Sequence, residues 1–178
     1  MSGKTIYRIL ADTLTGLRLI LAAALAALGA RNGQQSLATA VVLILTGWTA
    51  DTLDGHLARK SGREGETFLG RNDLLVDVVF SLGGFTYFAL SGFVSLWLAL
   101  FYVAVSGGIV LRFPCRSAVI TLMAPLAILP AAVSFLHSPR LLGLMALWSA
   151  ITLVADRRQF ARRVARYLTG FTATTERQ

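Results

Sequence analysis

Charged residues are scarce in this sequence. They make up 15% of the 178 residues, whereas hydrophobic residues make up 55%. A soluble domain of this size carries about 25% charged residues, so the composition favours a membrane protein. Cysteine is limited to Cys115, which excludes an intramolecular disulfide. Histidine is limited to His56 and His137, and neither has a second His or Cys at ligand spacing, so we interpret both as polar residues of loops or helix ends.

Long hydrophobic runs are abundant instead. A bilayer span needs roughly 20 mostly apolar residues, and fewer where the membrane thins or flanking residues snorkel. Six runs approach this length, at about 13–30, 36–50, 74–90, 94–111, 117–136 and 141–155. We therefore predict an all-α fold, an integral membrane bundle of six transmembrane helices forming a single domain over residues 1–178. Short amphipathic interfacial helices are expected at the N- and C-termini, over 1–12 and 156–171.

The net charge of +8 has a topological explanation. With the N-terminus inside, six spans place nearly all lysines and arginines on the cytoplasmic side and only Arg31 and Arg140 outside. This distribution follows the positive-inside rule. The basic balance therefore predicts an orientation in the membrane, and nucleic acid is not an expected partner.

Four aspartates flank the second and third apolar runs. Asp51 and Asp54 close one run, and Asp73 and Asp77 open the next. Helical spacing places the members of each pair on one face, so the four acids are expected to meet at the mouth of a hairpin. An aspartate at the bilayer centre costs about 2.5–3.5 kcal/mol to insert, and neighbouring carboxylates repel one another without a cation. Because Mg²⁺ takes oxygen ligands and is typically completed by substrate phosphates, the pattern predicts a metal site for a diphosphate substrate.

A simpler interpretation makes these acids ordinary helix-end charges. Asp73 and Asp77 would suit a helix N-terminus, where the dipole stabilises anions. Asp51 and Asp54 follow an apolar run and are expected at the C-terminal end of a helix, where the dipole disfavours anions. Helix-end placement therefore does not explain all four acids.

The same residues resemble a known family. Asp51-x2-Asp54-Gly55-x2-Ala58-Arg59 followed by Gly70-x2-Asp73-x3-Asp77 is similar to the D-x2-D-G-x2-A-R-x8-G-x3-D-x3-D signature of the CDP-alcohol phosphotransferases. The first half matches fully, whereas in the second half the glycine lies one place nearer its aspartate and the segment before it is two residues longer. Leu14-Thr15-Gly16-Leu17-Arg18 also resembles the L-T-x-x-R of many members' first helix, although the Pro-Asn that often precedes it is here Ala11-Asp12.

The resemblance implies a reaction and a set of roles. An alcohol would attack the phosphorus of a CDP-alcohol such as CDP-diacylglycerol and release CMP, in phospholipid biosynthesis. Asp77 would be the general base, and the ligands of Mg²⁺ or Mn²⁺ would be Asp51, Asp54, Asp73 and Asp77. The residues that would bind CDP are Asp54, Gly55, Ala58, Arg59 and Gly70. A homodimer in a bacterial inner membrane, with the active site facing the cytoplasm, is also implied.

Three arginines bear on the identity of the acceptor alcohol, because they could bind a phosphate group on it. Arg112 and Arg116 lie four residues apart at the cytoplasmic end of the fourth run and could hold an acceptor phosphate, although topology alone would also explain them and Pro114 separates them. Arg18, inside the first run, could serve the site from the bundle interior or snorkel to the headgroups. A phosphate-bearing acceptor favours glycerol 3-phosphate, with inositol phosphate as the second candidate.

Two other functions remain open. An intramembrane Mg²⁺-dependent prenyltransferase also uses aspartate-rich motifs, but such enzymes need about nine helices and set their motifs far apart in sequence. A non-enzymatic divalent-cation-binding or transporting membrane protein would place acids near mid-bilayer. Such a protein would not need Gly55, Ala58 and Arg59 in register with those acids.

Overall fold

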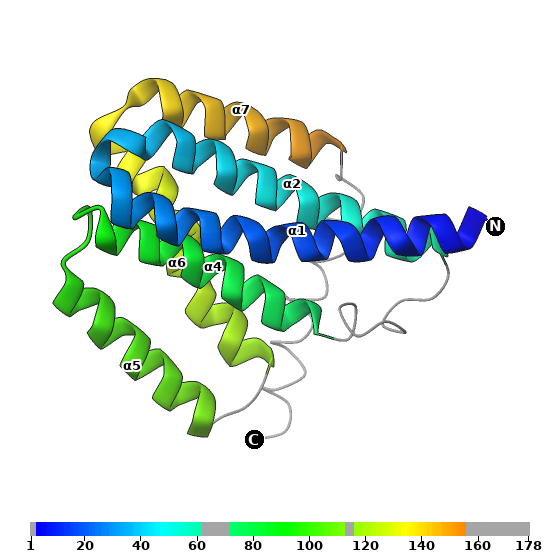
Figure 1. Ribbon diagram of the computed structural model, residues 1–178, viewed down its shortest axis with the longest axis horizontal. Helices are drawn as coiled ribbons and strands as arrows, with labels where there is room; N and C mark the ends of the chain where they lie inside the picture. Colours follow the sequence, from blue (N-terminus) through cyan, green and yellow to red (C-terminus); the bar gives the residue numbers. More distant parts are fainter. Residues whose placement is uncertain (1–2, 62–71, 113–115, 156–178) are drawn as a thin grey trace, which may run out of the picture.

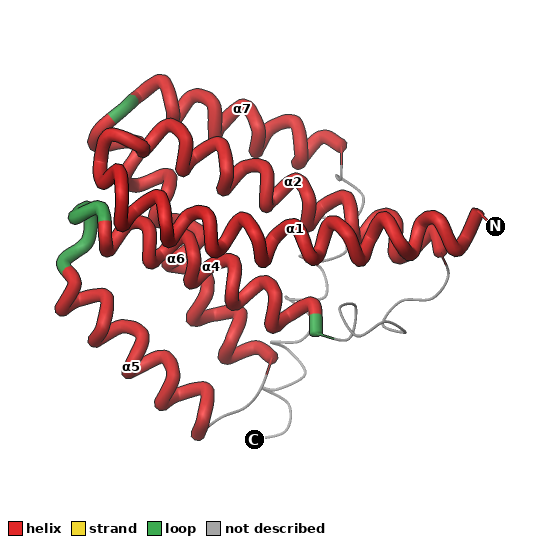
Figure 2. The backbone as a smooth tube through the Cα atoms, viewed as in Figure 1, coloured by secondary structure: helices red, strands yellow, loops and turns green. Residues whose placement is uncertain are grey.

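The computed structural model describes residues 3–61, 72–112 and 116–155, and these residues form helices joined by short turns. The elements are α1 (Gly3–Asn32), the 3-10 turn η1 (Gly33–Ser36), α2 (Leu37–Ser61), α4 (Asp73–Leu90), α5 (Leu96–Arg112), α6 (Arg116–His137) and α7 (Pro139–Ala155). Within these ranges there is no strand, as Figure 2 shows. The predicted all-α class is therefore confirmed.

The helices are apolar enough to be consistent with a membrane protein. By length and composition, the helical stretch Ile9–Leu57, which runs from α1 through η1 into α2, could cross a membrane. An 18-residue segment of this stretch has a mean hydropathy of 1.7. The other apolar helical stretches in the described residues are shorter, at Leu74–Leu90, Leu96–Arg112, Thr121–His137 and Pro139–Ala155. Each of the six predicted runs thus corresponds to a helical stretch, although the run predicted from 94 begins two residues before α5, and the count of six spans stays a prediction.

Two predicted helix boundaries are wrong. The N-terminal interfacial helix is not a separate element, because α1 runs without a break from Gly3 to Asn32. Helix α2 continues to Ser61, so Asp51 and Asp54 lie inside it and not at its C-terminal end. The dipole argument against helix-end charges therefore does not apply to these two acids, since that effect is confined to the last turn. The predicted C-terminal helix over 156–171 lies outside the described residues.

Helix α1 is the centre of the bundle. It lies between α2 and α4 and packs along both, while α7 runs beside α2 (Figure 1). The core on these faces is formed by buried side chains that include Leu21, Leu25, Val41, Ile44, Phe80 and Phe88. Transfer of such apolar side chains from water into the protein interior is the main contribution that favours folding.

The contact between α1 and α4 depends on glycine. A Cβ atom on Gly83 would lie 2.6 Å from Cα of Ala22, and one on Gly29 would lie 2.9 Å from Cα of Tyr87. Small residues at such crossings let helix backbones approach closely, which is typical of helix packing in membranes. The close approach brings one face of α4 against α1 along several turns.

Helix α5 lies at the edge of the bundle and contacts α4 and α6 (Figure 1). The connection from α4 turns at Gly92, whose φ of +78° is a left-handed conformation that glycine adopts without strain. Much of the α5 surface is apolar and exposed, including Leu96, Trp97, Leu98, Leu100, Phe101 and Leu111. A surface of this kind is what lipid or a partner subunit would cover.

Candidate active site

Carboxylates from α2 and α4 meet around one guanidinium group from α1. Arg18 Nη1 donates a hydrogen bond to Oδ1 of Asp51 at 2.8 Å and another to Oδ1 of Asp77. Its Nη2 donates to Oδ2 of Asp54 at 2.6 Å. Three consecutive long helices of the described chain are therefore joined at one point, which we call the Arg18 cluster: Arg18, Asp51, Asp54 and Asp77.

The Arg18 cluster has a closed side and an open side. The side chain of Arg18 is 1% exposed and that of Asp54 is 8% exposed. In contrast, the side chains of Asp51 and Asp77 are 49% and 44% exposed. A ligand approaching from the open side would therefore meet these two carboxylates first, while Asp54 and Arg18 lie beneath them.

Thr15 is part of the same arrangement. It lies one helical turn before Arg18 on α1, and its hydroxyl donates to Oδ2 of Asp54 at 3.1 Å while also lying 3.1 Å from the carbonyl of Ala11. Oδ2 of Asp54 thus accepts bonds from both Thr15 and Arg18, which holds this carboxylate in one orientation. Thr15 had no predicted role, although it stands in the L-T-x-x-R segment.

The position of Arg18 decides between the two interpretations of this residue. Snorkelling to the headgroups would leave the guanidinium exposed, but the side chain is almost fully buried and bound by three aspartates. Arg18 therefore belongs to the bundle interior, and the snorkelling interpretation is wrong. Its bonds in this structure are to carboxylates, and its predicted contact with an acceptor phosphate is not tested.

For the other predicted site residues, the structure gives the position in the chain of helices but only in part the position of the side chain. Gly55 lies in α2 directly after Asp54, and the backbones of Ala58 and Arg59 continue the same helix. Asp73 is the first residue of α4, four residues before Asp77. Arg112 ends α5 and Arg116 begins α6, so the predicted common helical face is not tested. Gly70 lies outside the described residues, and so do the side chains of Ala58, Arg59, Asp73 and Arg116.

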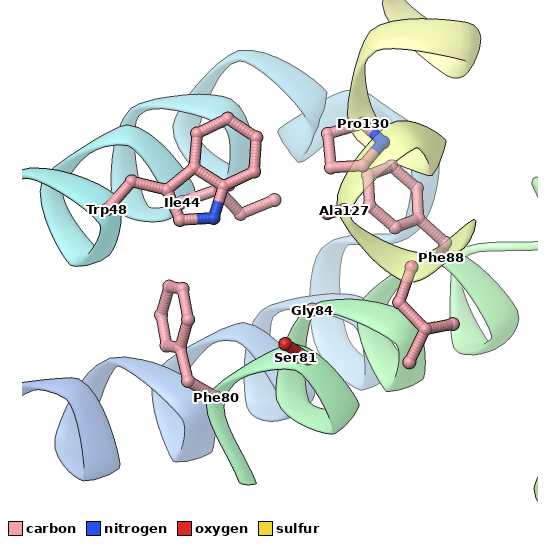
Figure 3. Close-up of a pocket in the computed structure, with 9 residues that line it drawn as sticks. Ile44, Trp48, Phe80, Ser81, Gly84, Phe88, Ala127 and Pro130 are labelled. Atoms are coloured by element: carbon pink, nitrogen blue, oxygen red, sulfur yellow. The ribbon is translucent and has the colours of Figure 1, made fainter. Parts of the chain in front are cut away.

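An apolar layer closes the site one turn deeper in the bundle. Gly47 has no Cβ, and the ring of Phe80 occupies the space that such an atom would take, 2.1 Å from its position. Figure 3 shows Ile44 and Trp48 of α2 opposite Phe80 of α4, around a cavity of about 20 Å³ that also reaches α6. Trp48 lies three residues before Asp51 on α2 and Phe80 three residues after Asp77 on α4, so this apolar layer is about one helical turn from the carboxylates.

The donor set of the Arg18 cluster suits a hard cation. Mg²⁺ and Mn²⁺ bind carboxylate oxygens, and here oxygens from two helices already point at one positive group. In this arrangement that group is the guanidinium, and among the described residues no set of three His, Cys, Asp or Glu side chains is placed to hold a metal ion. Carboxylates are suitable ligands for the expected divalent cation, but in this structure they accept hydrogen bonds from Arg18.

Comparison with known proteins identifies the family. The family model described as CDP-alcohol phosphatidyltransferase matches residues 8–172, which is nearly the whole chain. Neither the curated proteins nor the solved structures contain a match. The matched range includes α1 from Arg8 onward, so Thr15 and Arg18 are covered together with the aspartates of α2 and α4. The chain therefore belongs to the CDP-alcohol phosphatidyltransferase family, whose members transfer a phosphoalcohol group from a CDP-alcohol.

Proposed function

We propose that this protein transfers the phosphatidyl group of CDP-diacylglycerol to glycerol 3-phosphate and releases CMP, as a step of phospholipid biosynthesis. The observation that carries the proposal is the convergence of Asp51, Asp54 and Asp77 from two helices at one point. These are three of the four aspartates of the family signature, and the family transfers phosphoalcohol groups.

Asp51, Asp54, Asp73 and Asp77 would hold Mg²⁺ or Mn²⁺. When bound, the ion would neutralise the charge on the CDP diphosphate and on the leaving phosphate. The chain's own contribution is orientation: Thr15 fixes Oδ2 of Asp54, and the half-exposed carboxylates of Asp51 and Asp77 face the open side. Asp73 begins the same helix as Asp77, one turn earlier, which supports its place in this set.

Asp77 would act as the general base. A positioned carboxylate can take the proton of the acceptor hydroxyl while the hydroxyl oxygen forms a bond to the lipid-side phosphorus. The bond between this phosphorus and the oxygen of CMP breaks in the same step. The 44% exposure of the Asp77 side chain supports this role, because a base must be reachable by the substrate. The apolar layer formed by Phe80, Gly47 and Trp48 would keep water from approaching from below.

The remaining contacts would be to the two substrates. Gly55 follows Asp54 in α2, and with Ala58 and Gly70 it would leave space for the cytidine, while Arg59 would face the nucleotide phosphates. Arg112 at the end of α5 and Arg116 at the start of α6 would hold the acceptor phosphate. Guanidinium groups bind phosphate through paired hydrogen bonds, which favours glycerol 3-phosphate, with inositol phosphate next.

We also propose the placement of the chain in the cell. Six spans would cross a bacterial inner membrane as one domain with the Arg18 cluster at the cytoplasmic side, and two copies would form a homodimer. The exposed apolar surface of α5 and the hydropathy of Ile9–Leu57 support the membrane. The basic residues that follow the positive-inside rule support the orientation.

The test is an assay of purified protein in detergent or liposomes. CDP-diacylglycerol is incubated with a panel of alcohols that includes glycerol 3-phosphate and inositol phosphate, with and without EDTA, and CMP is measured. CMP release that requires glycerol 3-phosphate and stops with EDTA would support the proposal. CMP release with another alcohol, but not with glycerol 3-phosphate, would refute the assignment of glycerol 3-phosphate as the acceptor. Turnover of a prenyl diphosphate in place of CDP-diacylglycerol would favour a prenyltransferase. Metal binding without any turnover would favour the non-enzymatic alternative.

A further inference from the structure

Arg18 holds a position that a metal ion would also seek. Its Nη1 bridges Asp51 on α2 and Asp77 on α4, and its Nη2 binds Asp54. The carboxylate oxygens that would coordinate a divalent cation are therefore already engaged by a cation that belongs to the chain.

We propose that Arg18 is an internal counter-ion that stabilises the metal-free site and that a divalent cation must displace from Asp51 and Asp77 in order to bind. The identity of this cation rests on the proposed function. The role of Arg18 is positioning: it acts on the substrate only through the carboxylates that it holds. Arg18 thereby sets how tightly the site takes up metal.

The charges of the cluster support displacement. Three carboxylates accept hydrogen bonds from one guanidinium, and a divalent cation would seek the same carboxylate oxygens. Two cations held by the same oxygens repel each other strongly in a partly buried site, where the effective dielectric constant is about 20. Metal binding is therefore expected to loosen the bonds from Nη1, and loss of Arg18 is expected to tighten metal binding.

The two sides of the cluster would respond differently. Oδ2 of Asp54 also accepts a bond from Thr15, and its side chain is nearly buried, so this carboxylate would stay in place. Asp51 and Asp77, in contrast, have side chains that are about half exposed. These two carboxylates can turn toward an ion on the open side while α1 remains attached to α2 through Asp54.

The test compares Arg18→Gln with Arg31→Gln, a matched substitution at an exposed arginine of the same helix. Mn²⁺ binding to the full-length protein is measured by electron paramagnetic resonance, and thermal unfolding is measured in EDTA and in saturating Mn²⁺. We expect Arg18→Gln to bind Mn²⁺ about tenfold more tightly than wild type. In EDTA, Arg18→Gln should unfold at a lower temperature than wild type. Saturating Mn²⁺ should raise the unfolding temperature of Arg18→Gln by more than it raises that of wild type. Arg31→Gln should match wild type in both measurements.

Unchanged or weaker Mn²⁺ binding by Arg18→Gln would overturn the proposal, because an arginine that only ties helices together would lower stability without affecting metal affinity. If Arg18→Gln cannot be purified, Arg18→Lys decides. Lysine keeps the charge but lacks the planar guanidinium fork whose two Nη atoms hold these carboxylates, so the Mn²⁺ affinity of Arg18→Lys should exceed that of wild type. Equal affinity would overturn the proposal.

The outcomes also separate this inference from the proposed function. If wild type binds no Mn²⁺ while Arg18→Gln does, Arg18 is the counter-ion and the metal-dependent reaction is wrong. If wild type binds Mn²⁺ and releases CMP while Arg18→Gln binds Mn²⁺ no more tightly, the reaction stands and the counter-ion role is wrong.

Discussion

Replacing Gly83 with alanine should push α1 and α4 apart and disturb the Arg18 cluster. The added Cβ would lie 2.6 Å from Cα of Ala22 and 2.7 Å from its carbonyl oxygen, where ordinary contacts are 3.4–4 Å. Because the opposing atoms are backbone atoms, they cannot rotate away, and the helices must separate by roughly 1 Å. Overpacking of this kind costs about 1–3 kcal/mol, against a gain of about 1 kcal/mol in helix propensity.

The neighbouring Gly84 offers a matched control. A Cβ at this position would meet nothing within 4 Å, so Gly84→Ala should keep the propensity gain without the clash. Taking the upper end of the overpacking cost, we expect Gly83→Ala to be destabilised by about 2 kcal/mol and Gly84→Ala to be stabilised by up to about 1 kcal/mol. Thermal unfolding of the detergent-solubilised protein should show Gly83→Ala melting roughly 4–8 °C lower than wild type.

The effect should reach the active site. Asp77 lies six residues before Gly83 on α4, which is about 9 Å along the helix, and its bond to Arg18 crosses the same α1–α4 interface. CMP release should therefore fall several-fold in Gly83→Ala and stay near the wild-type rate in Gly84→Ala. Equal stability of the two variants would refute the close packing of α1 on α4. Lower stability with unchanged CMP release would refute the link between this packing and the site.

Three further predictions concern the site directly. Asp77→Asn should abolish CMP release while CDP-lipid still binds, since the variant keeps the shape of the site but loses the base; normal turnover would exclude Asp77 from that role. Thr15→Val should lower kcat/KM about fivefold, because the bond to Asp54 is worth about 1 kcal/mol, and Thr15→Ser should restore it. If valine and serine behave alike, the Thr15 hydroxyl does not orient Asp54. EDTA should stop CMP release and added Mg²⁺ or Mn²⁺ should restore it, whereas continued release in EDTA would refute a metal-dependent reaction.

The helices were predictable from the sequence because apolar runs report them directly. The run 74–90 became α4 (Asp73–Leu90), and the run 141–155 became α7 (Pro139–Ala155). Their polar ends were less predictable. Helix α2 runs on to Ser61 after its apolar run finishes near Ala50, since loss of hydrophobicity marks a change of surroundings and does not break a helix. For the same reason α1 begins as early as Gly3.

The carboxylate pairs were predictable from their spacing, whereas their partner was not. Asp51 and Asp54 had to share a helical face, and the family signature joined them to Asp77. That Arg18 would lie among them depends on how far α1 is rotated against α2 and α4, and one sequence carries no information about this angle. The Thr15 bond to Asp54 depends on the same rotation. The convergence of Asp73 on this point, the span count and the homodimer stay predictions.

The buried position of Arg18 constrains the order in which the chain can be assembled. Its partners lie 33, 36 and 59 residues further along, so α1 is synthesised before any of them. In the proposed membrane placement, an unpaired arginine costs about 2.5–3.5 kcal/mol during insertion. The first helix should therefore linger at the translocon or the bilayer surface until α2 arrives and should settle fully only with α4. Chains truncated before Asp51 are expected to be degraded in the cell, whereas chains that extend past α4 should be inserted stably and escape degradation.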